Sequence, residues 1–273
     1  MVAQDRLPRI AVVIPAYGRV DETRELVSSL QRGPEEPLVY VVDNGGDYTA
    51  VGSEVVLRPE SNLGWLKGTN LGTVRALEAG AEALIWMNND VRLSPAFVKE
   101  LTGALRDGVG VVAPCYDDHL STQRRGYDGP AAEYAAVAQE HEVSAVDGTC
   151  VLVTTEVLAG IGLLDETRFG LFGWGAIDDL CLRARRAGYA VVVTERAYLQ
   201  HAQGSTADRV HGIYEHVARA EMWLGMSRKH GRRWPAEFPD LAYAREGRAW
   251  YVTDRLHLWL WKRGRRVSGP SAE

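Results

Sequence analysis

The residues Asn88, Asn89 and Asp90 follow a short apolar stretch and suggest the first chemistry in the sequence. A carboxylate at the end of a strand can hold a divalent cation such as Mg²⁺ or Mn²⁺, while phosphate oxygens fill other coordination positions. The neighbouring amides can assist through water or through hydroxyl groups of a ligand. The alternative is an Asx-turn that only closes the strand. Spacing alone leaves both interpretations open.

Two further polar clusters also follow apolar runs. Tyr17 to Arg19 comes after the run 10–14, and Asp43 to Asp47 comes after the run 38–42. In parallel sheets, ligands bind at the carboxyl ends of the strands. We therefore expect both clusters to share one binding edge with residues 88–90.

The hydrophobic pattern predicts the elements that position these clusters. Buried strands are expected at 10–14, 38–42, 54–57, 83–87, 109–114, 150–154 and 190–193. Helices are expected at 21–31, 69–79, 95–107, 178–187 and 208–230. Asp21 is predicted to cap the first of these helices and Ser94 the third, which begins with Pro95. The alternation predicts an α/β fold with a mostly parallel central sheet covered on both faces.

Composition excludes several classes of protein. The 273 residues suffice for one large α/β domain or two modest ones. A net charge of -5 disfavours binding to nucleic acid, which usually requires a basic surface. Cys115, Cys150 and Cys181 lack the spacing of a zinc cluster or a disulfide framework. No signal peptide and no apolar run of about 18 residues is present, so we expect a cytoplasmic protein.

Several motifs occur in order along the chain. Residues 10–17 read IAVVIPAY, residues 41–45 read VVDNG, and residues 62–72 read NLGWLKGTNLG before the strand that ends at Asp90. Together they resemble the family 2 glycosyltransferases, especially the rhamnosyltransferase-like branch, over residues 8–230. The resemblance implies a Rossmann-like GT-A fold. It also implies an inverting transfer of a sugar from a dTDP-, UDP- or GDP-sugar to an acceptor hydroxyl.

The resemblance assigns Pro15, Tyr17 and Asp43 to the nucleoside pocket. The Asp43 carboxylate can accept hydrogen bonds from a pyrimidine or a ribose, but it can also be an ordinary turn residue. Arg19 and Arg58 can pair with phosphate, or they can be solvated surface charges.

The motif at 62–72 borders the donor in the family. It places Asn62 and Asn70 on a loop beside the nucleotide sugar, although Asn70 could instead cap the following helix. Lys67 stands where the family often carries a small residue, and it is a candidate phosphate contact.

The resemblance also strengthens the metal interpretation of Asp90, with Asn88 and Asn89 beside it in the donor site. His201 lies near a position where family members often carry a histidine. An imidazole can serve as a third metal ligand, although a lone histidine is usually structural.

The acceptor side is represented by GWGAIDDLCLRARRAGY at 173–189, which looks like the family's acceptor signature. An inverting transferase needs a carboxylate that takes the proton of the acceptor hydroxyl. Ala176 and Ile177 stand at the usual acidic positions, so Asp178, or else Asp179, must supply this base. Both aspartates could instead only favour the helix dipole.

Three further residues belong to the predicted acceptor pocket. Asp147 and Gly148 resemble a segment that lines it. Trp174 can stack on the face of a sugar, or it can be an ordinary core aromatic. The acceptor could be a glycan, a lipid-linked glycan or a small natural product.

We expect a catalytic domain at 1–206, with a donor half at 8–114 and an acceptor half at 115–206, and a C-terminal helical extension at 207–273. The extension ends in aromatic and basic residues that could contact anionic lipid at the inner membrane face. The alternative is that they pack on the domain or on a second subunit of a homodimer. These residues are Trp250, Tyr251, Leu256, Leu258, Trp259, Leu260, Trp261, Lys262, Arg263, Arg265 and Arg266.

Other functions remain as alternatives. A sugar-phosphate nucleotidyltransferase typically carries a GxGTR loop, but residues 15–19 read PAYGR. A dinucleotide-dependent oxidoreductase would show GxGxxG after the first strand, and none is present. The missing acidic pair leaves open a catalytically silent protein that only binds a sugar nucleotide.

Overall fold

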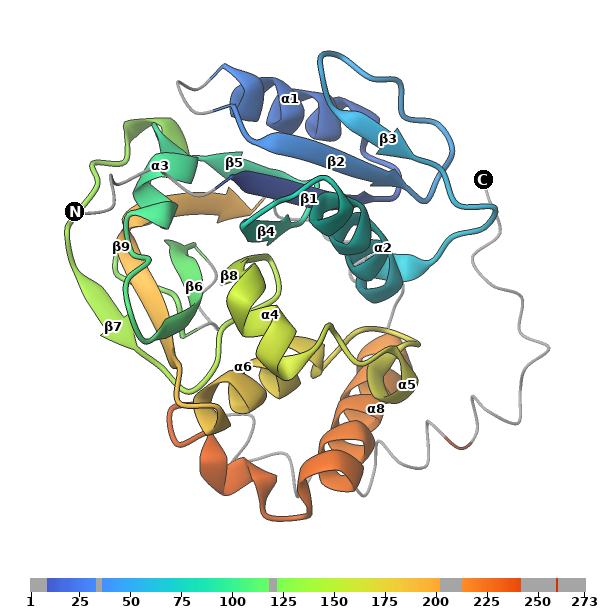
Figure 1. Cartoon of the computed structure of the whole chain (residues 1–273), viewed down its shortest axis with the longest axis vertical. Helices are drawn as coiled ribbons and strands as arrows, with labels where there is room; N and C mark the ends of the chain where they lie inside the picture. Colours follow the sequence, from blue (N-terminus) through green and yellow to red (C-terminus); the bar gives the residue numbers. More distant parts are fainter. Residues whose placement is uncertain (1–8, 33–35, 118–121, 202–212, 242–258, 260–273) are drawn as a thin grey trace.

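The computed structural model describes residues 9–32, 36–117, 122–201, 213–241 and 259. In these residues a nine-stranded mixed sheet forms the centre, in the order β3-β2-β1-β4-β8-β6-β9-β5, with β7 paired to β9. Helices cover both faces of the sheet, and α8 stands against α5 at the outer side (Figure 1).

The first half of the sheet is parallel, as the sequence predicts. It consists of β1 (Ile10–Ala16), β2 (Leu38–Asp43), β3 (Val55–Leu57) and β4 (Ala83–Met87). The connecting helices are α1 (Val20–Gln31) and α2 (Gly64–Glu78). The strands β1, β2 and β4 are buried almost throughout, because helices lie on both sides of them.

The second half of the sheet mixes strand directions. It consists of β5 (Val91–Leu93), β6 (Val109–Tyr116), β7 (Glu140–Glu142), β8 (Cys150–Thr154) and β9 (Ala190–His201). β8 runs antiparallel to β4 and β6, and β5 and β7 run antiparallel to β9, whereas β6 and β9 are parallel. An apolar run predicts a buried strand but not its direction.

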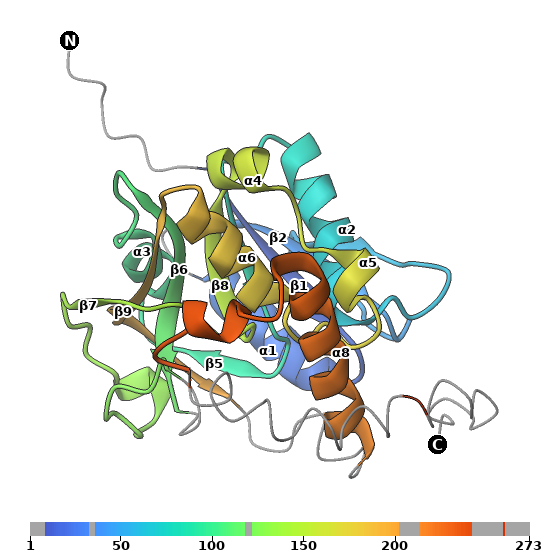
Figure 2. The same ribbon diagram turned by 90° about the horizontal axis from the view of Figure 1, so that it is seen from below.

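The remaining helices are short except for two. They are α3 (Phe97–Thr102), α4 (Thr155–Ile161), α5 (Glu166–Phe169), α6 (Ala176–Arg186) and α8 (Ile213–His230), with 3₁₀ turns η1 (Ala131–Glu133) and η2 (Trp234–Glu237). Figure 2 shows α8 and α6 from below, with α5 beside them. None of the described helices is long and apolar enough to cross a membrane.

Two apolar clusters fill the space between sheet and helices. One contains residues of α1 and α3, and the other contains residues of α2, α4, α6 and α8. Alternate residues of β1 belong to different clusters, with Val12 and Ile14 in the first and Ala11 and Val13 in the second. This alternation follows from the pleat, which turns successive side chains to opposite faces.

Several predicted helix boundaries are wrong, and one of them is the start of α6 at Ala176 rather than at Asp178. α2 begins at Gly64 rather than Thr69, and α1 begins at Val20, so Asp21 lies in its first turn and is not its cap. α3 begins at Phe97 after Ala96, and the Ser94 hydroxyl instead accepts the backbone N–H of Tyr198, 3.0 Å away. Ser94 therefore ties β5 to β9, a tertiary use that local sequence does not reveal.

Two predictions concern the C-terminal part of the chain. β9 continues eight residues beyond the predicted end at Val193, which carries it to His201. The predicted aromatic and basic C-terminal segment lies outside the described residues, apart from the exposed Trp259.

Candidate functional site

The carboxyl ends of β1, β2 and β4 form one edge of the sheet. β1 pairs in parallel with both neighbours, and Ala16 at its end lies opposite Asp43 at the end of β2. The clusters that follow these strands therefore lie side by side, and the prediction of a shared edge is confirmed.

Asp90 lies at this edge between the side chains of Arg19 and His201. Its carboxylate is only 8 % exposed, and its Oδ2 lies 3.5 Å from Nη1 of Arg19. Its Oδ1 lies 3.1 Å from Nε2 of His201. The pairing of β5 with β9 sets Val91 opposite His201 and so brings the end of β9 to Asp90.

The backbone that carries Arg19 is in the left-handed region, with a φ of 52°. This conformation costs a residue with a side chain about 1–2 kcal/mol, so other contacts must hold it. The Asn89 amide donates to the carbonyl of Gly18 at 3.1 Å and to the hydroxyl of Thr23 at 2.9 Å. Asn89 thus fixes the β1–α1 turn, and the turn presents Arg19 to Asp90.

The surroundings of His201 are acidic. Its backbone N–H donates to Asp117, 3.0 Å away. The hydrogen bond with Asp90 raises the pKa of His201 above its usual value, although burial works in the opposite direction. The negative charges of Asp90, Asp147 and Asp117 raise this pKa further. The same negative potential would attract a metal cation.

The side chains present fit a divalent cation that shares its coordination with a ligand. Among the described residues, no three His, Cys, Asp or Glu side chains form a metal cluster. Asp90 and His201 can offer two ligand atoms, and a bound diphosphate and water would have to supply the others. This set matches Mg²⁺ or Mn²⁺ in phosphate sites better than a cation enclosed by protein alone.

Asp43 organises the loop after β2. Its Oδ1 accepts the N–H of Gly46 at 2.8 Å and its Oδ2 the N–H of Tyr48 at 3.1 Å. Arg58 lies 3.4 Å from the same Oδ2 and donates to the carbonyl of Tyr48 at 2.6 Å. The carboxylate is 1 % exposed and holds this turn, while Arg58 is half-exposed. The contact of Asp43 with a nucleoside stays a prediction.

The asparagines of the motif at 62–72 hold the protein's own backbone. Asn62 Oδ1 accepts the N–H of Gly64 at 2.7 Å, and Asn44 Oδ1 accepts the N–H of Leu63 at 2.9 Å. The expected loop position of Asn70 is wrong, because Asn70 lies inside α2. Its amide donates to the Leu164 carbonyl at 2.9 Å and to Glu166 at 2.8 Å, and so ties α2 to α5.

The two adjacent aspartates of α6 differ in their surroundings. Asp179 is fully buried, and its oxygens lie 2.9 Å from Arg183, 3.0 Å from Lys229 and 2.7 Å from His230. These contacts hold the Asp179 carboxylate inside the protein, and its role as the alternative base stays a prediction. Asp178 is 8 % exposed in the first turn of the same helix.

Ala176 and Ile177, which stand where the sequence resemblance would place an acidic pair, are core residues. Both are buried in the cluster shared by α2, α6 and α8. A Cβ atom on Gly148 would lie 3.3 Å from Ile177 Cγ1 and 3.4 Å from the Trp65 ring. Ile177 therefore lies close to Gly148 and Trp65.

No protein-family model matches the chain. The uncharacterized protein Rv1525 of Mycobacterium tuberculosis is 36% identical over 233 residues, which cover 84% of this chain and 88% of that protein. The uncharacterized protein Mb1552 of Mycobacterium bovis matches to the same extent. The chain belongs to the family of these mycobacterial proteins.

Solved structures show which fold this family has. The mannosyltransferase PcManGT of Pyrobaculum calidifontis, solved with GDP-Man and Mn²⁺, superposes with a TM-score of 0.60 at 14% identity, over 97% of this chain and 78% of that one. GalNAc-T7, solved with UDP, GalNAc and Mn²⁺, gives a TM-score of 0.57 at 14% identity, over 91% and 58%. The fold is therefore the GT-A fold of glycosyltransferases.

The remaining candidate donor and acceptor residues lie on several different elements. Tyr17 is 47% exposed at the end of β1, where its ring faces solvent, whereas Pro15 is buried in the strand. Asn88 donates its backbone N–H to Thr149. Lys67 is exposed on the first turns of α2, and Trp174 is partly buried against the core.

The Asp147 segment is braced by neighbours. Asp147 Oδ1 accepts the N–H of Thr149 at 2.8 Å, and its own N–H donates to Gln123 at 2.6 Å. Asp147 itself is exposed. This bracing holds the loop before β8 next to the site edge.

Sequence reasoning missed Trp65 as a site residue. Its ring lies close to Gly148, and a Cβ atom on Gly173 would lie 3.5 Å from it. Its indole N–H is buried, with no hydrogen-bond partner among the described residues. Trp65 stands inside the motif at 62–72, and an aromatic residue in that motif was the only signal that the sequence offered. Its position next to both predicted acceptor segments follows only from the tertiary structure.

Proposed function

We propose that the protein is a metal-dependent glycosyltransferase that moves a sugar from a nucleotide diphosphate to an acceptor hydroxyl with inversion. The observation that carries this proposal is the pairing of Asp90 with His201 at the carboxyl edge of a GT-A sheet. The resemblance of the sequence motifs to family 2 glycosyltransferases supports it, and so do the nucleotide-sugar ligands named for the structural neighbours.

Asp90 and His201 would hold the cation in this function. A divalent cation at that position neutralises negative charge on the diphosphate leaving group. Arg19, which lies against Asp90 in this structure, is within reach of the same phosphates and would exchange its carboxylate partner for one of their oxygens. Tyr17 would stack on the base, and Arg58 would pair with phosphate.

Asp178 is the candidate base. Its position in the first turn of α6 places it beside the loop that carries Trp174. The carboxylate would take the proton of the acceptor hydroxyl while the oxygen attacks the anomeric carbon from the face opposite the nucleotide. One displacement of this kind inverts the configuration of the sugar.

Thermal unfolding with candidate donors tests the donor site. We expect one class among UDP-, dTDP- and GDP-sugars to stabilise the wild type only when Mn²⁺ or Mg²⁺ is present. Free ligand at about 100 times its dissociation constant adds about 2.7 kcal/mol, which is readily detected. Asp90→Ala should lose this stabilisation because it removes a metal ligand.

Asp107→Ala is the matched control, because Asp107 is exposed after α3 and no ion pair of it is described. It should behave like the wild type. Stabilisation of Asp90→Ala equal to that of the wild type would contradict the metal site. Retention of configuration in the product would contradict the single displacement.

A second candidate function is the binding of a sugar nucleotide without transfer. The observation that favours it is the burial of Ala176 and Ile177 where the family carries acids. Metal-dependent binding of a nucleotide sugar, without transfer or release of the sugar, would select this function.

A further inference from the structure

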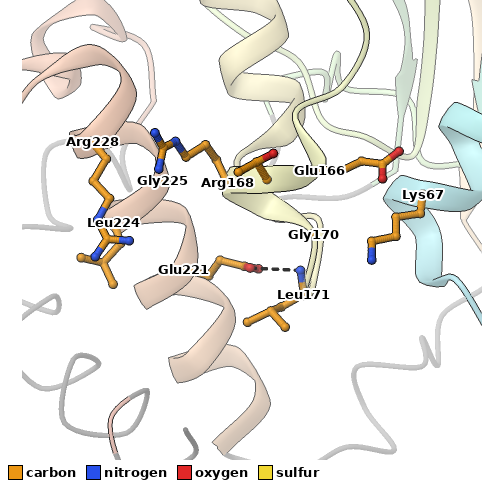
Figure 3. A pocket seen from close by; sticks show the side chains of 10 residues that line it. Lys67, Glu166, Arg168, Gly170, Leu171, Glu221, Leu224, Gly225 and Arg228 are labelled. Atoms are coloured by element: carbon orange, nitrogen blue, oxygen red, sulfur yellow. Dashed lines mark hydrogen bonds between the residues drawn. The ribbon is translucent and has the colours of Figure 1, made fainter.

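A cavity of about 290 Å³ lies between α2, α5 and α8, apart from the edge that carries Asp90. Figure 3 shows the side chains that line it. Three are cationic: Lys67 comes from α2, Arg168 from α5 and Arg228 from α8. Nothing in the proposed donor chemistry uses Arg168 or Arg228.

The two arginines come from facing elements. Figure 3 shows the Arg168 side chain extending from α5 toward α8, the helix that carries Arg228. The helices are close because Gly225 of α8 lacks a side chain, and a Cβ atom there would lie 2.4 Å from Phe169. No hydrogen bond or ion pair of the Arg168 or Arg228 guanidinium group is found within the described part of the chain.

The acidic residues of the cavity are already engaged. Glu221 accepts the backbone N–H groups of Leu171 at 3.0 Å and Phe172 at 2.9 Å. Glu166 accepts from the Asn70 amide at 2.8 Å. These bonds orient the carboxylates toward the protein, so the cations of the cavity lack a dedicated carboxylate partner.

The cavity adjoins the predicted acceptor region. Gly170 and Leu171 line it, and the chain continues from them through Gly173 and Trp174 to α6. Lys67 is two residues from Trp65, which packs near Gly173. Leu171 is 47% exposed beside the cations and adds an apolar surface.

We propose that this cavity binds the phosphate group of a phosphorylated acceptor, held by Arg168 and Arg228 with Lys67 nearby. Guanidinium groups suit phosphate because they donate two parallel hydrogen bonds to its oxygens. The phosphate could belong to a lipid carrier, whose apolar chain would lie along Leu171, or to a sugar phosphate. The assignment to an acceptor rests on the proposed transferase function.

Direct binding to the full chain tests the proposal. Geranyl phosphate and glucose 1-phosphate are titrated calorimetrically without nucleotide, and geraniol serves as the neutral control. We expect at least one phosphate to bind and geraniol not to bind. The double variant Arg168→Gln/Arg228→Gln should bind that phosphate at least about tenfold more weakly, because two charged donors are lost.

Arg75→Gln is the matched control, since Arg75 pairs with Glu78 on α2 and does not line the cavity. It should bind phosphate like the wild type. Binding of geranyl phosphate alone identifies a lipid carrier, and binding of glucose 1-phosphate alone identifies a sugar phosphate. Absence of binding by both, or equal binding by the double variant and the wild type, overturns the proposal.

Two measurements separate this proposal from the proposed function. The double variant should keep the metal-dependent stabilisation by nucleotide sugar, and its loss would assign the arginines to the donor and overturn the acceptor site. Asp90→Ala should still bind the phosphate probe. If no nucleotide sugar binds the wild type while the probe does, the transferase function fails and the anion site remains.

Discussion

Asp178 and Asp179 are adjacent carboxylates whose surroundings assign them different roles. Asp179 pairs with Arg183 and Lys229 and hydrogen-bonds to His230 inside the protein, and Lys229 also pairs with Asp165 at 2.8 Å. Removing one partner of a buried ionic group leaves the others uncompensated, which is strongly destabilising. Asp178 lies in the first turn of the same helix, beside the candidate acceptor loop.

We predict that Asp179→Asn lowers the free energy of unfolding by about 3–5 kcal/mol, because Arg183 and Lys229 lose a buried counter-charge. Asp178→Asn should lower the transfer rate by about 10²–10⁴-fold, as expected for a general base. Urea unfolding and turnover with the identified donor measure both effects. Unchanged turnover in Asp178→Asn would contradict its assignment as the base.

At the scale of elements, α2 is the helix that joins the donor and acceptor sides. It packs closely on β1 and β2 through glycines, and a Cβ atom on Gly68 would lie 3.2 Å from Pro15. Its first turns carry Trp65 and Lys67 toward the acceptor side, and Asn70 ties it to α5. A displacement of α2 would therefore alter both sides of the site together.

We predict that Gly72→Ala destabilises the protein by about 1–3 kcal/mol, since its Cβ atom would lie 2.3 Å from Val13 Cγ1 and overpack the core. Gly160→Ala in α4 is the control, because nothing lies within 4 Å of its Cβ position. That change should be neutral or stabilising by up to about 1 kcal/mol through helix propensity. Denaturant unfolding measures the free energy of unfolding of the Gly72→Ala and Gly160→Ala variants. Equal values for both would argue against close packing of α2 on β1.

At the scale of the whole molecule, α8 is part of the main core. Met222, Trp223 and Met226 are buried in the cluster that also contains residues of α2, α4 and α6. Glu221 and the pair Lys229–His230 add polar contacts to the 171–172 backbone and to Asp179. The expected division at 206 therefore separates residues that share one apolar cluster.

We predict that a chain of residues 1–206 does not unfold cooperatively, because it lacks these three core side chains. Burying each contributes about 1.5–3 kcal/mol, and their sum approaches the whole stability of a typical domain. Near-ultraviolet circular dichroism during heating measures this, with the full chain as the cooperative reference. A cooperative transition in 1–206 would support the predicted division.

The strand pattern and the polar residues after each strand were sufficient to predict the fold class, the shared edge and the place of Asp90. These features are local, because burial on both faces and the turn after a strand leave a record in neighbouring residues. Helix starts were less predictable, since Ser94 bonds to Tyr198 across the sheet and not to its own helix.

Only the tertiary structure decided which side chains are available for chemistry. Asn70, Asp43 and Asp179 have residue types that suit a site, but their partners occupy them. Trp65 and the arginines of the α5–α8 cavity became site candidates only when distant segments were brought together. The physical reason is that a side chain's role depends on its burial and its partners, and these partners lie up to 111 residues away, as for Asp90 and His201.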